Sequence, residues 1–259
     1  MRAPAVLAAA MLSVAGCGGG DDRGASANRD ADKPALTVSA AASLKKAFTA
    51  YGETLTDADA KFSFAGSDEL AAQIQQGVKP DVVAAADTKL PEQLFQKGLV
   101  ERPTVFAGNR LVLAVPAEGA KAASLEDVEQ SGVKLAVGAE SVPVGSYTRT
   151  VLDKLPAARS RAILANVRSE EPDVAGIVGK LTQGAVDAGF VYISDVRGTD
   201  GKLTAIELPD DLQPSVAYGA AVVKGAKQPT QARAFIDGLL SGPGQKALEE
   251  AGFEPPPSR

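Results

Sequence analysis

From Pro34 onward the sequence alternates short apolar runs with segments of helical periodicity. The runs at residues 36–40 and 81–85 are typical of buried strands, and the segment at residues 43–55 has the apolar spacing of a helix. Strands that alternate with helices in this way predict parallel sheets covered by helices on both faces. The chain is therefore expected to have an α/β fold.

The same patterns extend over the rest of the chain. Strands are predicted at residues 36–40, 62–65, 81–85, 110–116, 134–137, 163–167, 188–192 and 215–223. Helices are predicted at residues 43–55 and 68–76, in a segment ending at Gly98, from the capping-box pattern Ser124-Leu125-Glu126-Asp127 onward, and at residues 146–155, 173–182, 228–241 and 243–251. The layout predicts two lobes, each a mostly parallel sheet flanked by helices. The first lobe comprises residues 34–108 and 218–259, and the second comprises residues 109–217. Two strands that cross between the lobes would form a hinge, and a cleft between lobes is a usual place for a small ligand.

Composition excludes most catalytic chemistry. The 259 residues include no histidine, no tryptophan and one cysteine, Cys17. A histidine general base, a Ser-His-Asp or Cys-His pair, a His/Cys zinc site and a disulfide are therefore excluded. The net charge of −5 and the lack of a dense Lys/Arg run argue against a nucleic-acid partner.

The N-terminal segment is typical of an export signal. Arg2 precedes an apolar run that is shorter than the roughly 20 residues needed to span a membrane. The sequence Val14-Ala15-Gly16-Cys17 is similar to the bacterial lipoprotein box, in which the peptide is cut before the cysteine and the thiol is lipidated. Residues 1–16 are thus expected to be a lipoprotein signal peptide, and residues 17–33 a polar, Gly-rich, flexible tether. An ordinary signal peptide with a chance cysteine is the alternative.

Candidate binding residues follow the predicted strands. In open α/β sheets, ligands bind beyond the carboxyl ends of strands, where the chain enters a helix. Helix N-termini carry free N–H groups and a partial positive charge, which favour anions. The junctions contain small residues, hydroxyls and exposed backbone amides, at residues 40–44, 65–68, 142–147, 171–174 and 191–195. Each feature alone also has a purely structural explanation, as an N-cap serine, a first-turn proline or a packed tyrosine.

These residues also match a family in order and spacing. The most specific segments are Val142-Pro143-Val144-Gly145-Ser146-Tyr147 and Gly189-Phe190-Val191-Tyr192-Ile193-Ser194-Asp195; Ala41-Ala42-Ser43-Leu44, Gly66-Ser67 and Gly108-Asn109-Arg110 add to them. From about residue 36 to residue 253, the chain resembles the periplasmic molybdate-binding proteins of ABC transporters.

The resemblance implies a type II periplasmic-binding-protein-like fold that closes on a tetrahedral dianion, molybdate or tungstate. The ligand would be held by the hydroxyls of Ser43, Ser67 and Tyr192 and by the backbone N–H groups of Val144 and Val174. The chain would be a monomer that hands its ligand to a membrane permease. It would be lipid-anchored on the outer face of the membrane or periplasmic, with no enzymatic activity, no cofactor and no cation site.

One residue departs from the family pattern. Asp68 stands where many relatives have a small or hydroxyl residue. A carboxylate facing the cleft would repel a dianion. We expect Asp68 to lie in the first turn of its helix and point to solvent, where the helix dipole favours it.

A site built from such donors would be selective. A backbone N–H can only donate a hydrogen bond, and a hydroxyl can turn its hydrogen toward a ligand. Phosphate keeps a proton that needs an acceptor, so it should bind less tightly than molybdate or tungstate. Sulfate carries no proton and could be excluded only by size. Without a titrating contact, affinity should be constant between about pH 6 and 9.

Other functions remain open at this point. The acidic pairs in Glu170-Glu171-Pro172-Asp173 and Asp210-Asp211 could serve a carboxylate-dependent enzyme. A type II binding protein for sulfate, phosphate or a chelated metal is a second alternative, and a structural surface lipoprotein is a third. The sequence does not distinguish molybdate from tungstate, and it does not identify the permease.

Overall fold

The computed structural model describes residues 33–257, and these form two five-stranded sheets. The first sheet has the order β2-β1-β3-β10-β4, with β1 (Ala35–Ala41), β2 (Asp59–Ala65), β3 (Val82–Ala85), β4 (Thr104–Asn109) and β10 (Val216–Val222). β1 pairs in parallel with β2 and β3, whereas β10 pairs antiparallel with β3 and β4. β10 alone therefore runs against the other four strands.

The second sheet repeats this arrangement. Its order is β7-β6-β8-β5-β9, with β5 (Leu111–Pro116), β6 (Leu135–Gly138), β7 (Val167–Glu171), β8 (Ala188–Tyr192) and β9 (Leu203–Glu207). β6 pairs in parallel with β7 and β8, and β5 pairs antiparallel with β8 and β9. Both sheets are thus mostly parallel, as the sequence predicts.

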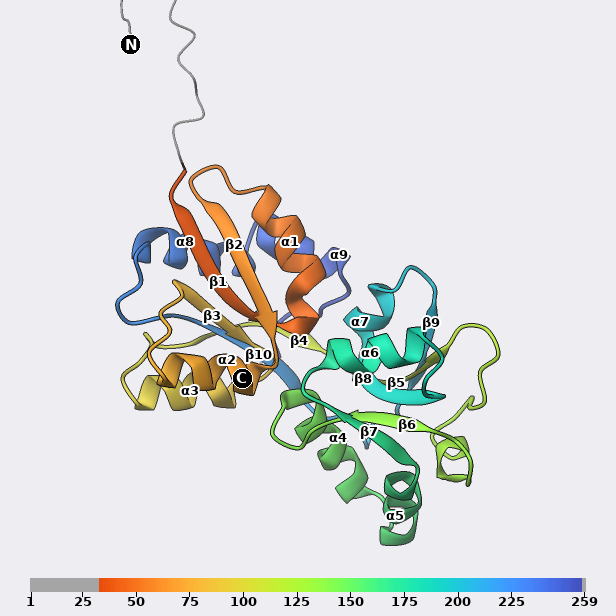
Figure 1. Ribbon diagram of the computed structural model, residues 1–259. Coiled ribbons are helices and arrows are strands. Elements are labelled where there is room, and N and C mark those ends of the chain that lie inside the picture. Colours follow the sequence, from red (N-terminus) through yellow and green to blue (C-terminus); the bar gives the residue numbers. More distant parts are fainter. Residues whose placement is uncertain (1–32, 258–259) are drawn as a thin grey trace, which may run out of the picture. The chain divides into compact units, whose positions relative to one another are not determined.

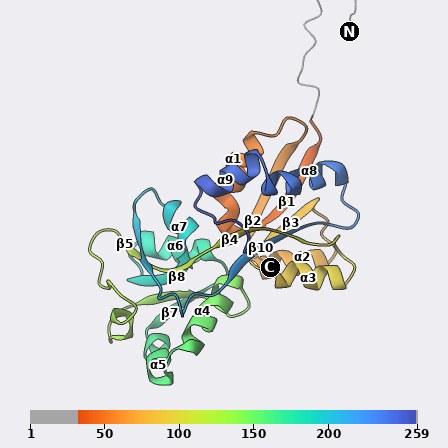
Figure 2. The same ribbon diagram turned by 180° about the vertical axis from the view of Figure 1, so that it is seen from behind.

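Each sheet and its helices form one lobe (Figures 1 and 2). The first lobe contains η1 (Ala42–Leu44), α1 (Lys45–Glu53), α2 (Ser67–Gln75), α3 (Lys89–Gln96), α8 (Pro229–Leu240) and α9 (Pro243–Glu250). The second contains η2 (Asp127–Glu129), α4 (Pro143–Lys154), α5 (Ala157–Ala165), α6 (Val174–Thr182) and α7 (Ile193–Arg197). Among the described residues, no helix is both long and apolar enough to cross a membrane. The expected signal peptide and Cys17 lie outside the described residues.

The chain crosses between the lobes twice, from β4 into β5 and from β9 into β10 (Figure 2). The first crossing is one residue long, Arg110, because β4 ends at Asn109 and β5 begins at Leu111. The C-terminal segment lies beside this crossing, where Gly108 and Glu254 exchange two backbone hydrogen bonds of 2.7 and 3.0 Å. The two-strand hinge predicted from the sequence is therefore present.

One predicted strand is wrong. Residues 163–167 were expected to be extended, but the chain forms α5 up to Ala165 and enters β7 only at Val167. The segment Ala157–Ala165 is rich in alanine and other good helix formers, which outweigh the short apolar pair near its end. β7 is an edge strand with alternating half-buried and exposed residues, so it lacks the apolar run by which a buried strand is recognised.

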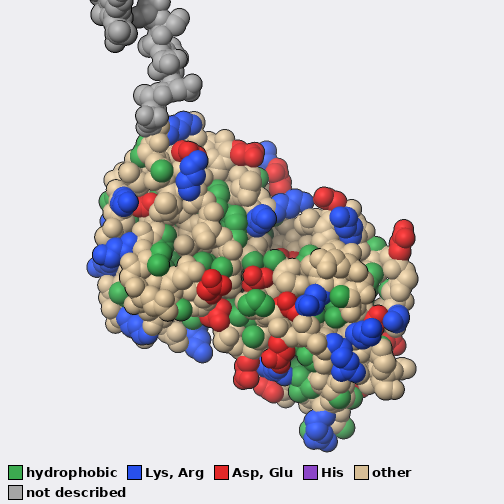
Figure 3. All heavy atoms as spheres, in the orientation of Figure 1, with side chains coloured by type: hydrophobic (Ala, Val, Ile, Leu, Met, Phe, Trp, Pro, Cys, Tyr) green, Lys and Arg blue, Asp and Glu red, His purple; other side chains and the backbone are tan. Residues whose placement is uncertain are grey.

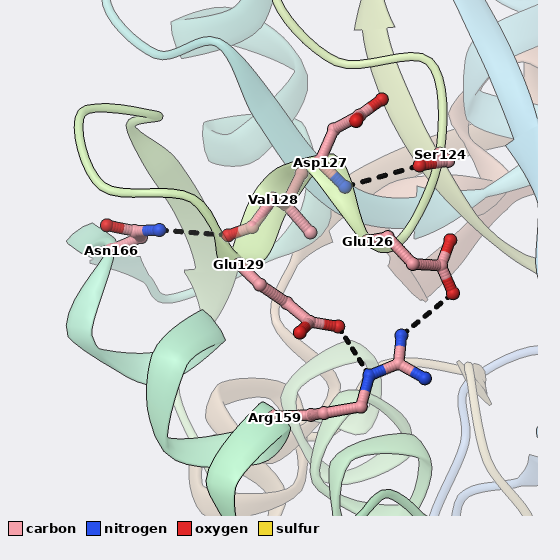
Figure 4. Close-up of polar contacts among 7 residues, drawn as sticks. All are labelled: Ser124, Glu126, Asp127, Val128, Glu129, Arg159 and Asn166. Carbon is pink, nitrogen blue, oxygen red and sulfur yellow. Dashed lines mark hydrogen bonds and ion pairs between the residues drawn. The ribbon is translucent and has the colours of Figure 1, made fainter.

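The helix predicted from Ser124 is also wrong. Only η2 (Asp127–Glu129) is helical there, and its first N–H donates a 3.2 Å hydrogen bond to the Ser124 hydroxyl (Figure 4). Arg159 of α5 pairs with Glu126 at 2.8 Å and with Glu129 at 2.6 Å, which holds this turn against α5. Ser124 accepts this hydrogen bond at the start of the turn, but the N-cap of η2 is Glu126, and the turn does not continue into an α-helix.

Candidate functional site

The carboxyl ends of strands from both sheets meet around a small cavity between the two lobes. It is small, with about 20 Å³ open to the centres of water-sized groups, which suits a compact ligand and not a sugar, peptide or nucleotide. Its lining residues are Ala41, Ala42, Ser43, Ala65, Gly66, Ser67, Ala86, Val142, Pro143, Val144, Asp173, Val174 and Tyr192. All five ligand-contact residues expected from the sequence are among them.

Three buried hydroxyls face this cavity. The exposed fraction is 8% for Ser43, 3% for Ser67 and 1% for Tyr192. The Tyr192 hydroxyl oxygen is buried and has no hydrogen-bond partner among the described residues. Burial raises the pKa of Tyr192 well above its usual value, so the group keeps its proton. A buried hydroxyl without a partner is costly, and a ligand that accepts its hydrogen bond would remove that cost.

Each of the two serine hydroxyls has a hydrogen-bond partner within the protein. The backbone N–H of Ala86 donates a 3.0 Å hydrogen bond to Ser67 Oγ. Because a hydroxyl has a single hydrogen, that of Ser67 remains free for another acceptor. Ser43 Oγ lies 2.9 Å from the hydroxyl oxygen of Tyr218, a fully buried residue of β10.

Helix N-termini supply the backbone donors. Val144 lies in the first turn of α4 and Val174 is the first residue of α6, so neither N–H has an acceptor within its own helix. α4 begins close to the end of β6 because position 145 is glycine: a Cβ there would clash with the carbonyl oxygen of Ala139. Asp173 caps α6, and its Oδ1 accepts a 2.9 Å hydrogen bond from the N–H of Gly176.

Contacts between the lobes surround the cavity. Ser141 of the second lobe donates a 2.9 Å hydrogen bond to Asp68 Oδ2 of the first. At position 66 a Cβ would clash with the carbonyl oxygen of Pro172, so the loops approach this closely only with glycine. Asp68 lies in the first turn of α2, as expected, and does not line the cavity. The prediction that its side chain points to solvent is wrong, because the side chain is partly buried and accepts a hydrogen bond from the other lobe.

A buried acid that sequence reasoning missed lies next to the site. Asp195 Oδ2 accepts a 3.0 Å hydrogen bond from the backbone N–H of Tyr192. Burial raises the pKa of Asp195 from 3.8 to about 7, and the neighbouring charge of Asp173 acts in the same direction. The hydrogen bond from Tyr192 lowers the pKa, but burial outweighs it. The site is therefore backed by a group that titrates near neutral pH.

Sequence reasoning also missed a polar network behind Ser43. It consists of Asn109 at the end of β4, Tyr218 on β10 and Ser194 in α7. Asn109 and Ser194 are each 4% exposed. The sequence signal that could have indicated this network is the presence of polar residues near the two crossings: Asn109, and Tyr218 in the mostly apolar strand predicted at residues 215–223.

No lysine or arginine is among the residues that line the cavity. In the described part of the chain, no group of three or more Asp, Glu, Cys or His side chains is placed to hold a metal ion. The acidic pair considered for catalysis is engaged in ion pairs, Glu170 with Arg149 at 3.3 Å and Glu171 with Lys180 at 3.5 Å. Basic and acidic side chains are interspersed on the face shown in Figure 3.

Known proteins are similar to this chain in sequence and in fold. Residues 36–254 match the family model for bacterial extracellular solute-binding proteins. A molybdate-binding protein of Mycobacterium tuberculosis is 36% identical over 259 residues, covering 96% of this chain and 97% of that protein. Its counterpart in Escherichia coli is 30% identical over 238 residues, covering 87% and 91%. The solved periplasmic molybdate-binding protein of Azotobacter vinelandii superposes with a TM-score of 0.77 over 86% of this chain and 100% of that one, at 19% identity, which shows the same fold.

Proposed function

Because this chain belongs to the family of bacterial extracellular solute-binding proteins, we propose that it captures molybdate or tungstate between its lobes and delivers it to the membrane permease of an ABC importer. The family is one of exported binding proteins, and its relatives in Mycobacterium tuberculosis and Escherichia coli are named for molybdate. Within this function the chain acts as a monomeric carrier and not as an enzyme. The observation that carries the proposal is the cavity, which combines buried hydroxyls with helix N-termini.

The donor set suits a small anion. Ser43, Ser67 and Tyr192 would each donate one hydrogen bond, and the backbone N–H groups of Val144 and Val174 would add two more. Hydrogen bonds to a charged partner contribute about 1.5–3 kcal/mol each. The N-termini of α4 and α6 add partial positive charge at the same point. A chain with a net charge of −5 can therefore bind a dianion without a cationic side chain.

The lobes would open and close about the two crossings. We take the first lobe to be residues 34–108 and 218–259 and the second to be residues 109–217. The hydrogen bond between Ser141 and Asp68 and the close approach of Gly66 to Pro172 form only when the lobes meet. These contacts would favour the closed form once an anion occupies the cavity.

The N-terminal segment would keep the binding protein at the membrane. We propose that residues 1–16 are removed, that Cys17 is lipidated and that the polar residues up to 33 act as a tether. Metabolic labelling with a fatty acid tests this directly. The Cys17→Ser variant should lose the label and be released from the membrane, while a membrane-bound Cys17→Ser variant would contradict the proposal.

A thermal-shift panel of molybdate, tungstate, sulfate and phosphate tests the ligand. A ligand at 100 times its Kd stabilises the folded chain by about 2.7 kcal/mol. For a chain of this size that corresponds to an increase in Tm of roughly 5–10 °C. Molybdate and tungstate should give this shift. The Ser43→Ala/Ser67→Ala double variant should lose most of it, measured against its own Tm without ligand, which falls because the Ala86 N–H and the Tyr218 hydroxyl lose their partners. A larger shift with sulfate or phosphate would assign the chain to another oxyanion, and no shift with any anion would refute the proposal.

A further inference from the structure

The side chain of Asn109 has a defined orientation. Its Oδ1 accepts a 2.9 Å hydrogen bond from the backbone N–H of Arg110. Its Nδ2 therefore points the other way, toward Ser194 Oγ at 2.8 Å and the Tyr218 hydroxyl oxygen at 3.4 Å. A side-chain amide nitrogen has two hydrogens and no acceptor capacity. Asn109 thus donates one hydrogen bond to Ser194 and one to Tyr218.

This orientation determines the direction of the next hydrogen bond. Because the Tyr218 oxygen receives a hydrogen from Asn109, its own hydrogen is the one available for Ser43 Oγ, 2.9 Å away. Tyr218 is fully buried, and burial raises its pKa well above the usual value, so it remains protonated. Asn109 Nδ2 cannot accept, so of these two contacts only Ser43 Oγ can take the Tyr218 hydrogen, which favours Tyr218 as the donor and Ser43 as the acceptor.

The hydrogen of the Ser43 hydroxyl remains available, and because Ser43 lines the cavity, this hydrogen can be donated to a ligand there. The direction of donation runs from Asn109 through Tyr218 to Ser43 and on to the ligand. Ser67 is held in the same way, by the N–H of Ala86. Each serine thus has one lone pair engaged from behind and a hydrogen that an anion in the cavity could accept.

We propose that Asn109 and Tyr218, neither of which lines the cavity, determine its selectivity for fully deprotonated oxyanions by holding Ser43 as a donor. The inference rests on the proposed function and deepens it. An isolated serine hydroxyl can donate or accept, so by itself it does not discriminate between molybdate and a protonated anion such as hydrogen phosphate. With Tyr218 donating to it, Ser43 has one lone pair engaged, and accepting the O–H of hydrogen phosphate would leave the Ser43 hydrogen without an acceptor, which is costly in a buried site.

The Tyr218→Phe variant tests this because it removes the hydroxyl and keeps the ring. Kd values for molybdate, sulfate and phosphate are measured by calorimetry, with competition for weak ligands, in mildly alkaline buffer where phosphate is a dianion with one proton. Sulfate is the size-matched anion without a proton, so the sulfate-to-phosphate ratio isolates the effect of the proton. We expect molybdate and sulfate to weaken by roughly tenfold while phosphate is unchanged or tighter.

A second variant reverses the direction of donation. Asn109→Asp has nearly the same shape, but its carboxylate can only accept, so Tyr218 would donate to it and Ser43 would donate to Tyr218. Ser43 would then present a lone pair to the cavity. The added negative charge weakens all dianions alike, so the readout is again the ratio of sulfate and molybdate affinity to phosphate affinity, which should fall by tenfold or more.

The matched control is Tyr51→Phe. Tyr51 is a buried tyrosine of the first lobe whose hydroxyl donates a 3.2 Å hydrogen bond to the carbonyl of Phe235. It should lower the Tm and leave every affinity ratio unchanged. If Tyr218→Phe and Asn109→Asp also keep the ratios of the unaltered chain, this inference is overturned. Failure of the proposed function would appear earlier and separately, as an unaltered chain that does not bind molybdate.

Discussion

Replacing Asp195 with asparagine should stabilise the protein at neutral and alkaline pH. The pKa of Asp195 is raised from 3.8 to about 7 by burial. The folded chain therefore holds a proton that the unfolded chain releases between about pH 4 and 7, and stability must decline as the pH rises through that range. Asparagine has nearly the same shape, does not titrate, and its side-chain oxygen can still accept the hydrogen bond from the N–H of Tyr192.

The size of the effect follows from the two pKa values. One pKa unit corresponds to about 1.4 kcal/mol, so the difference between 3.8 and about 7 amounts to about 4 kcal/mol. Near pH 4 Asp195 is protonated and the two proteins should have similar free energies of unfolding. Above pH 7 the Asp195→Asn variant should be more stable by up to about 4 kcal/mol, or roughly 10 °C in Tm.

Denaturant unfolding of both proteins over this pH range measures the difference directly. Subtracting one curve from the other cancels the other carboxylates, which titrate alike in both. Affinity gives a second readout, because the ionised Asp195 repels a dianion: molybdate binding to the unaltered chain should weaken as the pH rises through about 7, and binding to Asp195→Asn should not. A stability difference that is constant from acidic to alkaline pH would refute the reasoning.

Five further substitutions, at four residues, test individual contacts. Ser43→Ala and Ser67→Ala should each weaken molybdate binding by about 1–3 kcal/mol in calorimetry, because each removes a donor to a buried charge, and unchanged affinity for both would exclude them from the site. Val144→Ala should change the molybdate affinity little, whereas Val144→Pro should weaken it severely. The first turn of a helix tolerates proline, so this variant should keep the fold and lose only the N–H that donates to the anion. Equal effects of the two variants on affinity would mean that the valine side chain matters. Gly66→Ala should leave the Tm without ligand nearly unchanged but speed molybdate release at least tenfold in stopped-flow measurements, because its Cβ would meet the Pro172 carbonyl when the lobes close; release at the unaltered rate would show that this contact is not needed for closure.

The position of the cavity could be predicted from the sequence because it depends on topology. Parallel strands place their carboxyl ends on one edge of a sheet, so residues that follow such strands converge even when they are far apart in the chain. Ser43, Ser67, Val144 and Val174 follow strands and Tyr192 ends one, so all five line one cavity; the choice of these five among the junction residues came from the family resemblance. The fold could be predicted because the apolar runs of buried strands are strong local signals.

The errors come from segments where the local signal is weak. β7 is a polar edge strand, and the alanine-rich α5 before it has only one fully buried residue, Ile163. Neither shows the apolar periodicity from which buried elements are recognised. The turn after Ser124 matches a capping-box pattern but has only three helical residues, and no pattern in the sequence shows that the helix stops there.

The chemical state of the site residues depends on partners that the sequence places far away. In the proposed network, whether Ser43 donates or accepts depends on Tyr218, 175 residues later in the chain, and through it on Asn109. Whether Asp195 is charged is decided by how much of the fold covers it. The expectation of constant affinity between about pH 6 and 9 considered only the groups that contact the anion, and Asp195 is a titrating group just behind them. Local sequence thus identifies the groups that line the cavity, but the three-dimensional packing behind them sets the protonation of Asp195 and the hydrogen-bond partners of Ser43, and through these, we propose, the selectivity of the site.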